Sequence, residues 1–289
     1  MHRPIVILCP PRSFSSVISA MIGQHPKLYG FPELNLFLAD RLETLLALDA
    51  GPELLSAGNY SSGLQRVVAE LFFDGQTPAA LASAAGWMEK RRRVGTAAII
   101  DLLLNRIHPR TGVEKSTRTA MWAASMERAR TWYPQARFIH LLRHPIAAIQ
   151  SMTRGTPDDI GFVEYSANVW LHSHCAISRF LATLPPAQVF CVQAEKILRD
   201  PDQRLPHLMA WLEIGASKEE IEAMKRPENS PYARALEGVP ADSDAGFLAQ
   251  PRLRAIPEDP PLEIPAHWRL SRVLALRLTE MAQQFGYGL

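Results

Sequence analysis

The sequence predicts an α/β fold in which a central open parallel sheet is flanked by helices on both faces. Three apolar runs, at residues 5–9, 138–142 and 189–192, are each followed by a helical pattern, without a hairpin signal between them. Continuous apolar runs are typical of strands buried on both faces of a parallel sheet, and alternation of strands with helices favours an open sheet. The chain of 289 residues is 47% hydrophobic, so it can build a large core, and we predict a single domain over residues 1–289.

The first half of the chain alternates two short strands with helices. Pro10 and Pro11 end the first strand, and a helix with an apolar stripe begins near Ser13. Residues 27–31 form a second strand, and Pro32 then begins a helix with apolar residues every three or four positions, which places Glu33 in its first turn. Residues 51–94 are helical with interruptions, and we expect residues 36–95 to form a helical lid or substrate region.

The second half continues the same alternation. Residues 113–115 end a strand, residues 117–133 form a helix, and the strand at 138–142 leads into a helix that Pro145 opens. Helices are also predicted at residues 165–184, 201–214 and 269–285. The segment 215–267 is rich in proline and charge with little periodicity, so we predict a long irregular excursion rather than a separate domain.

Composition limits the possible partners and the compartment. The net charge of +2 and the pI near 8.5 are too mild for general nucleic-acid binding and fit a small anionic ligand better. The three cysteines, Cys9, Cys175 and Cys191, lack metal-site spacing and are predicted to be reduced thiols. The apolar segments are too short for a signal peptide or a membrane span, so we expect a cytoplasmic protein without a membrane partner.

Two strand-to-helix junctions carry an arginine. The first reads Pro11-Arg12-Ser13-Phe14-Ser15-Ser16-Val17, and the free N–H groups at such a helix start attract an anion, although an ordinary capped helix stays possible here. The second junction carries Arg143, with Ser151 eight residues later. Because ligands bind outside the carboxyl ends of parallel strands, both arginines are expected to face one crevice.

The phosphate-binding motifs of kinases and dinucleotide enzymes are missing. A nucleoside triphosphatase needs Gly-x-x-x-x-Gly-Lys-Ser/Thr, in which the lysine neutralises phosphates and the hydroxyl binds magnesium. The loop at residues 10–16 contains neither a glycine nor a following lysine. An anion-binding loop of another type is therefore indicated.

At these residues the chain resembles the sulfotransferases that use 3'-phosphoadenosine 5'-phosphosulfate (PAPS). "PRSFSS" is similar to their 5'-phosphosulfate loop, and Arg143 with Ser151 is similar to their 3'-phosphate motif. "HPKLYGFPELNLF" and "VEKSTRTA" resemble segments of tyrosylprotein sulfotransferases and of sulfotransferase domains in polyketide assembly lines. The resemblance implies a P-loop-like three-layer fold and PAPS as co-substrate without a metal, held by these residues: Arg12, Ser13, Phe14, Ser15, Ser16, Val17, Arg143 and Ser151.

Two features depart from the family pattern. Phe14 stands where glycine is usual, so either the loop needs no positive φ there or the strain is tolerated. The C-terminal Arg-Lys-Gly cluster of cytosolic sulfotransferases is missing, and we expect Arg252 and Arg254 to replace it.

The resemblance also implies catalytic roles. Glu33 would be the general base, Lys115 would bind the leaving phosphosulfate oxygens, and Arg12 would stabilise the developing charge. The alternatives are a helix-stabilising Glu33 and a surface Lys115, with His144 as a second candidate for the base.

The predicted reaction moves a sulfuryl group from PAPS to a hydroxyl on a small molecule or on a substrate tethered to a carrier protein. A kinase-like phosphoryl transferase and a catalytically silent nucleotide-binding module are the alternatives. The acceptor pocket is expected between residues 36–95 and 155–180, with four candidate aromatic side chains: Trp87, Phe162, Tyr165 and Trp170.

Overall fold

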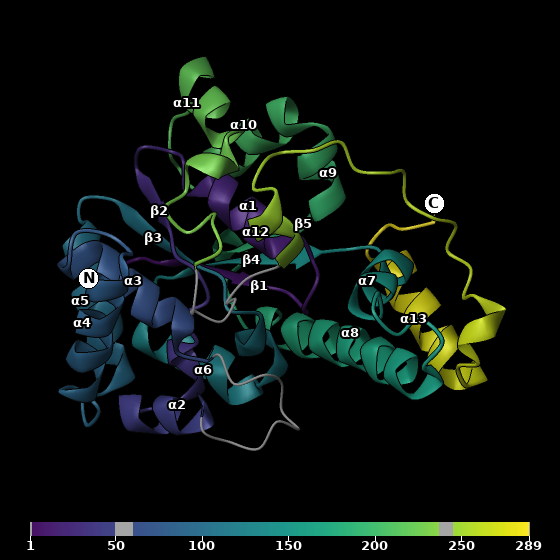
Figure 1. The fold of residues 1–289 in the computed structure, drawn as a ribbon. Helices are drawn as coiled ribbons and strands as arrows, with labels where there is room; N and C mark the ends of the chain where they lie inside the picture. The colour runs from purple at the N-terminus through teal and green to yellow at the C-terminus, as the bar shows by residue number, and fades with distance from the viewer. Residues whose placement is uncertain (1, 50–59, 237–244, 289) are drawn as a thin grey trace.

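Five parallel strands form the central sheet of the protein (Figure 1). The computed structural model describes residues 2–49, 60–236 and 245–288. The strands are β1 (Ile5–Leu8), β2 (Leu28–Gly30), β3 (Thr111–Glu114), β4 (Arg137–Leu142) and β5 (Val189–Gln193), in the spatial order β2-β3-β1-β4-β5. In register, Ile5 of β1 lies beside Val113 of β3 and Arg137 of β4. The predicted open parallel sheet is confirmed.

Helices cover both faces of the sheet and form the outer layers (Figure 1). They are α1 (Ser15–Ile22), α2 (Leu42–Asp49), α3 (Ser62–Phe72), α4 (Pro78–Glu89), α5 (Thr96–Ile107), α6 (Ala123–Trp132), α7 (Pro145–Met152), α8 (Ile160–Leu181), α9 (Ala194–Arg199), α10 (Pro201–Trp211), α11 (Lys218–Met224), α12 (Ala245–Ala249) and α13 (Arg272–Gln284).

The side chains of β1 alternate between two cores. Val6 and Leu8 pack with residues of α3 to α6 and α8 on one face, whereas Ile5 and Ile7 pack with α1, α9, α10 and α11 on the other. A third core joins α7, α8 and α13. Because all four residues of β1 are buried, an uninterrupted apolar run is the pattern that this strand requires.

The helix predicted from Pro32 is wrong in its first part. Residues 32–35 are irregular, a short 3₁₀ helix covers Leu36–Leu38, and α2 begins only at Leu42. Asn35 has a left-handed backbone with φ of 55°, its N–H donates to the Ser116 hydroxyl, and its side-chain amide donates to the Tyr60 carbonyl. These tertiary hydrogen bonds replace the helical ones, so Glu33 lies in a loop and not in a helical first turn.

Other boundaries differ from the sequence predictions. A 3₁₀ helix at Thr117–Met121 and an extended Trp122 precede α6, where one helix was expected. The excursion 215–267 contains α11, whose start Ser217 and Glu220 stabilise as a capping box, and the short α12. Residues 50–59 of the expected lid or substrate region 36–95 and residues 237–244 of the excursion lie outside the described part of the chain.

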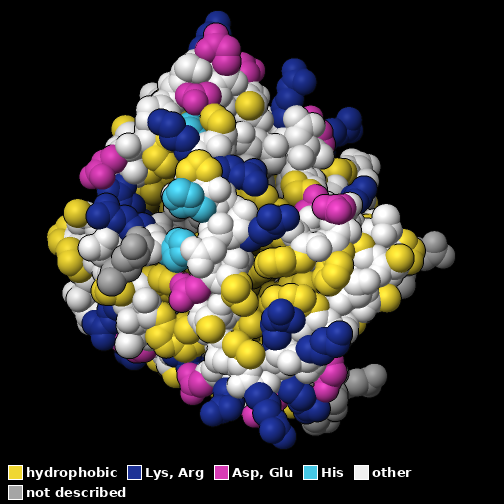
Figure 2. All heavy atoms as spheres, turned by 90° about the vertical axis from the view of Figure 1, so that its left-hand side faces the viewer, with side chains coloured by type: hydrophobic (Ala, Val, Ile, Leu, Met, Phe, Trp, Pro, Cys, Tyr) yellow, Lys and Arg dark blue, Asp and Glu magenta, His cyan; other side chains and the backbone are white. Residues whose placement is uncertain are grey.

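The surface mixes charged and apolar side chains. Figure 2 shows the face on the side of α3, α4 and α5, where basic, acidic and apolar groups are interspersed. None of the described helices has the length and apolar composition needed to cross a bilayer. All three cysteines are free thiols.

Candidate active site

The loop between β1 and α1 has two residues with left-handed backbones. Arg12 has φ of 64° and Phe14 has φ of 60°, a conformation that costs a residue with a side chain about 1–2 kcal/mol. The loop therefore needs positive φ at Phe14, and the strain is tolerated. This turn leads into α1, whose first residues are Ser15, Ser16 and Val17, and the N–H groups at such a helix start are directed toward an anion.

The Ser13 hydroxyl lies buried in the same loop. Its oxygen has no hydrogen-bond partner among the described residues, and Ser13 lines the large cavity beside the carboxyl ends of the strands. A buried hydroxyl without a partner is costly unless a ligand satisfies it. This position fits an anionic oxygen.

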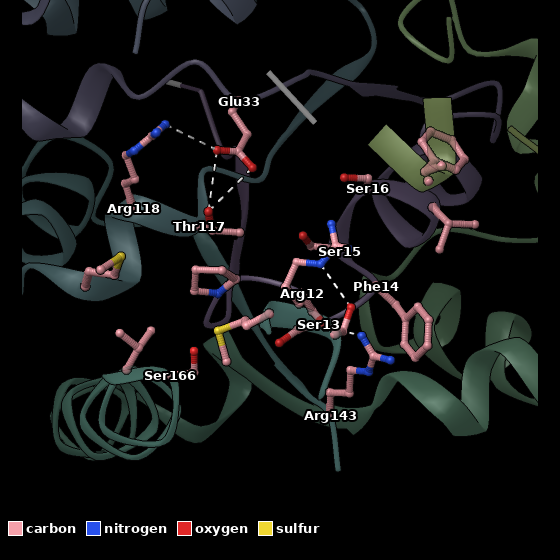
Figure 3. Close-up of a pocket in the computed structure, with 18 of the residues that line it drawn as sticks. Arg12, Ser13, Phe14, Ser15, Ser16, Glu33, Thr117, Arg118, Arg143 and Ser166 are labelled. Atoms are coloured by element: carbon pink, nitrogen blue, oxygen red, sulfur yellow. Dashed lines mark hydrogen bonds and ion pairs between the residues drawn. The ribbon is translucent and has the colours of Figure 1, made fainter. Parts of the chain in front are cut away.

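The two predicted arginines meet at this loop (Figure 3). Arg143 follows β4, and its guanidinium donates to the Arg12 carbonyl and stacks on Phe14, 3.8 Å from the ring centroid. The Arg12 Nε donates to the Ser151 hydroxyl on α7 over 3.0 Å. Arg12, Arg143 and Ser151 therefore line one cavity, on the same edge of the sheet.

Buried groups hold the backbone around Arg143. The Trp170 indole N–H donates to the Arg143 carbonyl over 3.0 Å, and the His144 N–H donates to a Glu195 oxygen over 2.8 Å. The Tyr287 hydroxyl, near the C-terminus, donates to the other Glu195 oxygen over 3.0 Å. Burial raises the pKa of Glu195, and these donors oppose that shift.

Glu33 lines the cavity and forms a buried ion pair with Lys115, which does not itself line the cavity. The Lys115 Nζ lies 3.0 Å from Glu33 Oε1 and 3.1 Å from the Ser16 hydroxyl, and its side chain is only 2% exposed. Lys115 is therefore not a surface lysine, since it joins the start of α1 to the loop after β2.

Two neighbours of Glu33 were not singled out from the sequence. The Thr117 hydroxyl lies 3.5 Å from both carboxylate oxygens, and the Arg118 guanidinium lies 3.9 Å from Oε2 (Figure 3). Both residues are in the segment "VEKSTRTA", so that motif carries more of the site than Lys115 alone.

The cavity has a volume of about 1450 Å³ and extends beyond the loop. Of the four aromatic candidates for the acceptor pocket, Phe162 and Tyr165 line this cavity. Trp87 does not, because it stacks on Phe72 with centroids 5.5 Å apart, and Trp170 is fully buried beneath Arg143. The sequence missed an apolar part of the rim, formed by Met121 and Trp122.

The remaining predicted residues fall into two groups. Arg252 and Arg254 line the cavity, and Arg254 donates to the Gln250 side chain over 2.9 Å. His144 does not line the cavity, because its imidazole packs edge-on against the Tyr287 ring, with the ring centroids 5.1 Å apart. Burial also lowers the pKa of His144. In the described part of the chain, no three His, Cys, Asp or Glu side chains gather as metal ligands.

Comparison with known proteins identifies the family and the structures that this chain is similar to. The model of the Sulfotransferase family matches residues 4–218. The sulfotransferase domain from the curacin biosynthetic pathway has 21% identity and a TM-score of 0.79, over 100% of this chain and 99% of that chain. The sulfotransferase domain of the Synechococcus PCC 7002 olefin synthase has 25% identity and a TM-score of 0.75, over 100% and 97% of the two chains.

A more distant similarity is to a sulfotransferase from Mycobacterium avium, at 15% identity and a TM-score of 0.52, over 98% of this chain and 76% of that one. A search of curated protein sequences found no significant match. The family match covers most of the chain, and the predicted resemblance is confirmed. The protein belongs to the sulfotransferase family, a class of PAPS-dependent transferases.

Proposed function

We propose that the protein transfers a sulfuryl group from PAPS to a hydroxyl acceptor, with Glu33 as the general base. The observation that carries this proposal is the position of Lys115, which contacts both Glu33 and the Ser16 hydroxyl at the start of α1. One buried cation thereby connects the anion-binding loop to the carboxylate. A sulfuryl donor bound at the loop and an acceptor hydroxyl beside it would both lie close to Lys115 and Glu33.

The residues of the loop fit the donor. Ser13 offers a buried hydroxyl without a partner among the described residues, and Ser15, Ser16 and Val17 offer helix-start N–H groups. When bound, PAPS supplies an activated sulfuryl group and a good leaving group. Arg12 and Lys115 place positive charge where negative charge develops on the leaving oxygen, and fixed cations of this kind stabilise a transition state strongly.

The other end of the nucleotide would be held by the corner after β4. Arg143 and Ser151 line the same cavity as the loop, and Arg252 and Arg254 contribute further cations. Arginine suits phosphate because its planar guanidinium donates two parallel hydrogen bonds. We therefore assign these four residues to the 3'-phosphate.

Glu33 would take the proton of the acceptor hydroxyl. Its carboxylate points into the cavity and is oriented by Lys115 and Thr117 (Figure 3). It lies outside any helix, so the helix-stabilising alternative for this residue lacks a helix to act on. A positioned base of this type contributes about 10²–10⁴-fold to a rate.

The acceptor would have an apolar part. Four partly exposed side chains form the rim away from the loop: Met121, Trp122, Phe162 and Tyr165. Two of the structurally similar proteins are sulfotransferase domains from the curacin biosynthetic pathway and from an olefin synthase. We propose a hydroxyl on a hydrophobic chain, either free or tethered to a carrier protein.

Release of adenosine 3',5'-bisphosphate from PAPS tests this function, with small alcohols and carrier-bound hydroxyacyl chains as acceptors. We expect Glu33→Gln to lower kcat at least 100-fold and to leave the Kd for adenosine 3',5'-bisphosphate within twofold of wild type. Glu280→Gln, on an exposed position of α13, is the matched control. Unchanged turnover in Glu33→Gln would remove Glu33 from the mechanism.

A further inference from the structure

A second buried carboxyl, Glu114, lies directly behind the Glu33–Lys115 pair. Glu114 is the last residue of β3, precedes Lys115 in the chain and is only 5% exposed. Its Oε2 has no hydrogen-bond partner among the described residues. Neither the proposed reaction nor the PAPS-binding residues use this carboxyl.

A directed chain of hydrogen bonds runs from Glu114 to the loop that carries Glu33. The Asn35 N–H donates to the Ser116 hydroxyl oxygen over 2.8 Å, and the Ser116 hydroxyl is bonded to Glu114 Oε1. Because the Asn35 N–H can only donate, the single proton of the Ser116 hydroxyl is free to point at Glu114. Ser116 is completely buried, so water does not compete for these bonds.

This chain acts at the point where the Glu33 loop changes direction. Asn35 is two residues after Glu33 and has the left-handed backbone that separates the loop from the following 3₁₀ helix. A left-handed non-glycine residue persists only where its surroundings fix it. The bond from Asn35 to Ser116 supplies part of that constraint, so weakening it loosens the backbone next to Glu33.

The Ser116 hydroxyl is held in place for Asn35 by its own hydrogen bond to Glu114. The strength of that Ser116–Glu114 hydrogen bond depends on the charge of Glu114. Burial raises the pKa of Glu114 to about 7, and the hydrogen bond from Ser116 opposes that shift. The charged groups that act on Glu114 are Glu33, which raises its pKa, and Lys115, which lowers it, while Glu114 itself raises the pKa of the Cys9 thiol after β1. Arg118 acts on this cluster through Glu33. A hydrogen bond to a carboxylate is roughly twice as strong as one to a neutral group.

We propose that Glu114 is a positioning residue that, through Ser116 and the Asn35 backbone, holds the Glu33 loop tightly when it is ionised and loosely when it is protonated. The effect on turnover rests on the proposed function of Glu33. The effect on the loop does not. Sulfuryl transfer would then be faster above pH 7 than below it.

Glu114→Gln is the variant that separates charge from hydrogen bonding, because the amide oxygen still accepts from Ser116 and cannot titrate. We expect its kcat to match wild type at pH 6 and to be about three- to tenfold lower at pH 8. The Kd for adenosine 3',5'-bisphosphate should stay within twofold at both pH values. Ser116→Ala breaks the chain and should lower kcat at both pH values, while Glu280→Gln should change nothing.

Amide hydrogen exchange of residues 33–38 gives a readout without turnover. Relative to wild type at the same pH, Glu114→Gln should exchange faster at pH 8 and equally at pH 6, and Ser116→Ala should exchange faster at both. Equal exchange of Glu114→Gln and wild type at pH 8, or parallel losses of kcat and nucleotide affinity, would overturn the inference. If wild type transfers no sulfuryl group, the proposed function fails, and the exchange result alone decides the role of Glu114.

Discussion

Phe14 combines a strained backbone with a side chain that stacks on Arg143. The left-handed backbone costs about 1–2 kcal/mol in a non-glycine residue, whereas glycine adopts it freely. A cation–π contact returns about 0.5–2 kcal/mol, depending on how well it is shielded from water. The phenyl ring therefore offsets much of its own strain by fixing the arginine.

Phe14→Gly tests this balance. We expect nucleotide affinity to fall about three- to tenfold because Arg143 loses its stacking partner, while the melting temperature stays equal or rises. Phe14→Leu keeps the backbone strain but loses the stacking on Arg143, so it should lower both the nucleotide affinity and the melting temperature. Titration calorimetry with adenosine 3',5'-bisphosphate measures the affinity, and wild-type affinity in Phe14→Gly would show that stacking does not position Arg143.

The Glu33–Lys115 pair should contribute to stability as well as to function, because both side chains are shielded, at 12% and 2% exposure. Removing one partner of a buried pair costs about 3–5 kcal/mol, since it leaves the other charge without a counterion. Lys115→Met should therefore destabilise the protein strongly, and the double variant Lys115→Met/Glu33→Gln should recover part of the loss. Urea unfolding of Lys115→Met, Glu33→Gln and the double variant checks this, and losses that add in the double variant would contradict the pairing.

At the scale of elements, the C-terminal segment after α13 holds the loop after β4. The Tyr287 hydroxyl donates to buried Glu195, whose other oxygen receives the His144 N–H. Tyr287→Phe removes one donor from a buried carboxyl, at a cost of about 1–3 kcal/mol. We expect a lower melting temperature together with weaker nucleotide binding through Arg143. Tyr165→Phe, at an exposed ring, is the stability control, and a Tyr287→Phe protein as stable as wild type would contradict this role.

The strands were predictable because burial on two faces leaves a continuous apolar run, as in β1 and β4. The prediction of a helix from Pro32 was wrong because the spacing of apolar residues carries no information about the tertiary hydrogen bonds that fix Asn35. The start of α11 depends on a capping box, and only Ile221 and Met224 of that helix are buried, so it left a weak periodic signal.

The site was predictable in part. Arg12 and Arg143 follow adjacent strands, and sheet topology alone brings them to one edge. Glu33 and Lys115 are 82 positions apart, and only the family resemblance linked them. Glu114 had no signal of its own, because its neighbours in space, Glu33 and the Asn35 backbone, come from a distant loop.

At the scale of the whole molecule, the buried pair His140 and His174 should make stability depend on pH. The His140 Nε2 lies 2.9 Å from the His174 Nδ1. Burial lowers the pKa of His140 to about 3 and the pKa of His174 well below 6.5. The unfolded chain then binds more protons than the folded one below about pH 6.5, so stability falls as pH falls. Urea unfolding from pH 8 to pH 5 should show a shallower fall in His174→Asn, and equal slopes would contradict this assignment.

At the scale of the whole cavity, we propose that Arg12 and Arg143 bind the two anionic groups of one adenosine nucleotide. Thermal unfolding with adenosine 3',5'-bisphosphate, ATP, and ATP with magnesium measures this most directly. At 100 times Kd a ligand stabilises the folded protein by about 2.7 kcal/mol, which corresponds to a rise of several degrees. We predict that rise with adenosine 3',5'-bisphosphate and its loss in Arg143→Ala. Stabilisation by ATP with magnesium alone would contradict the claim.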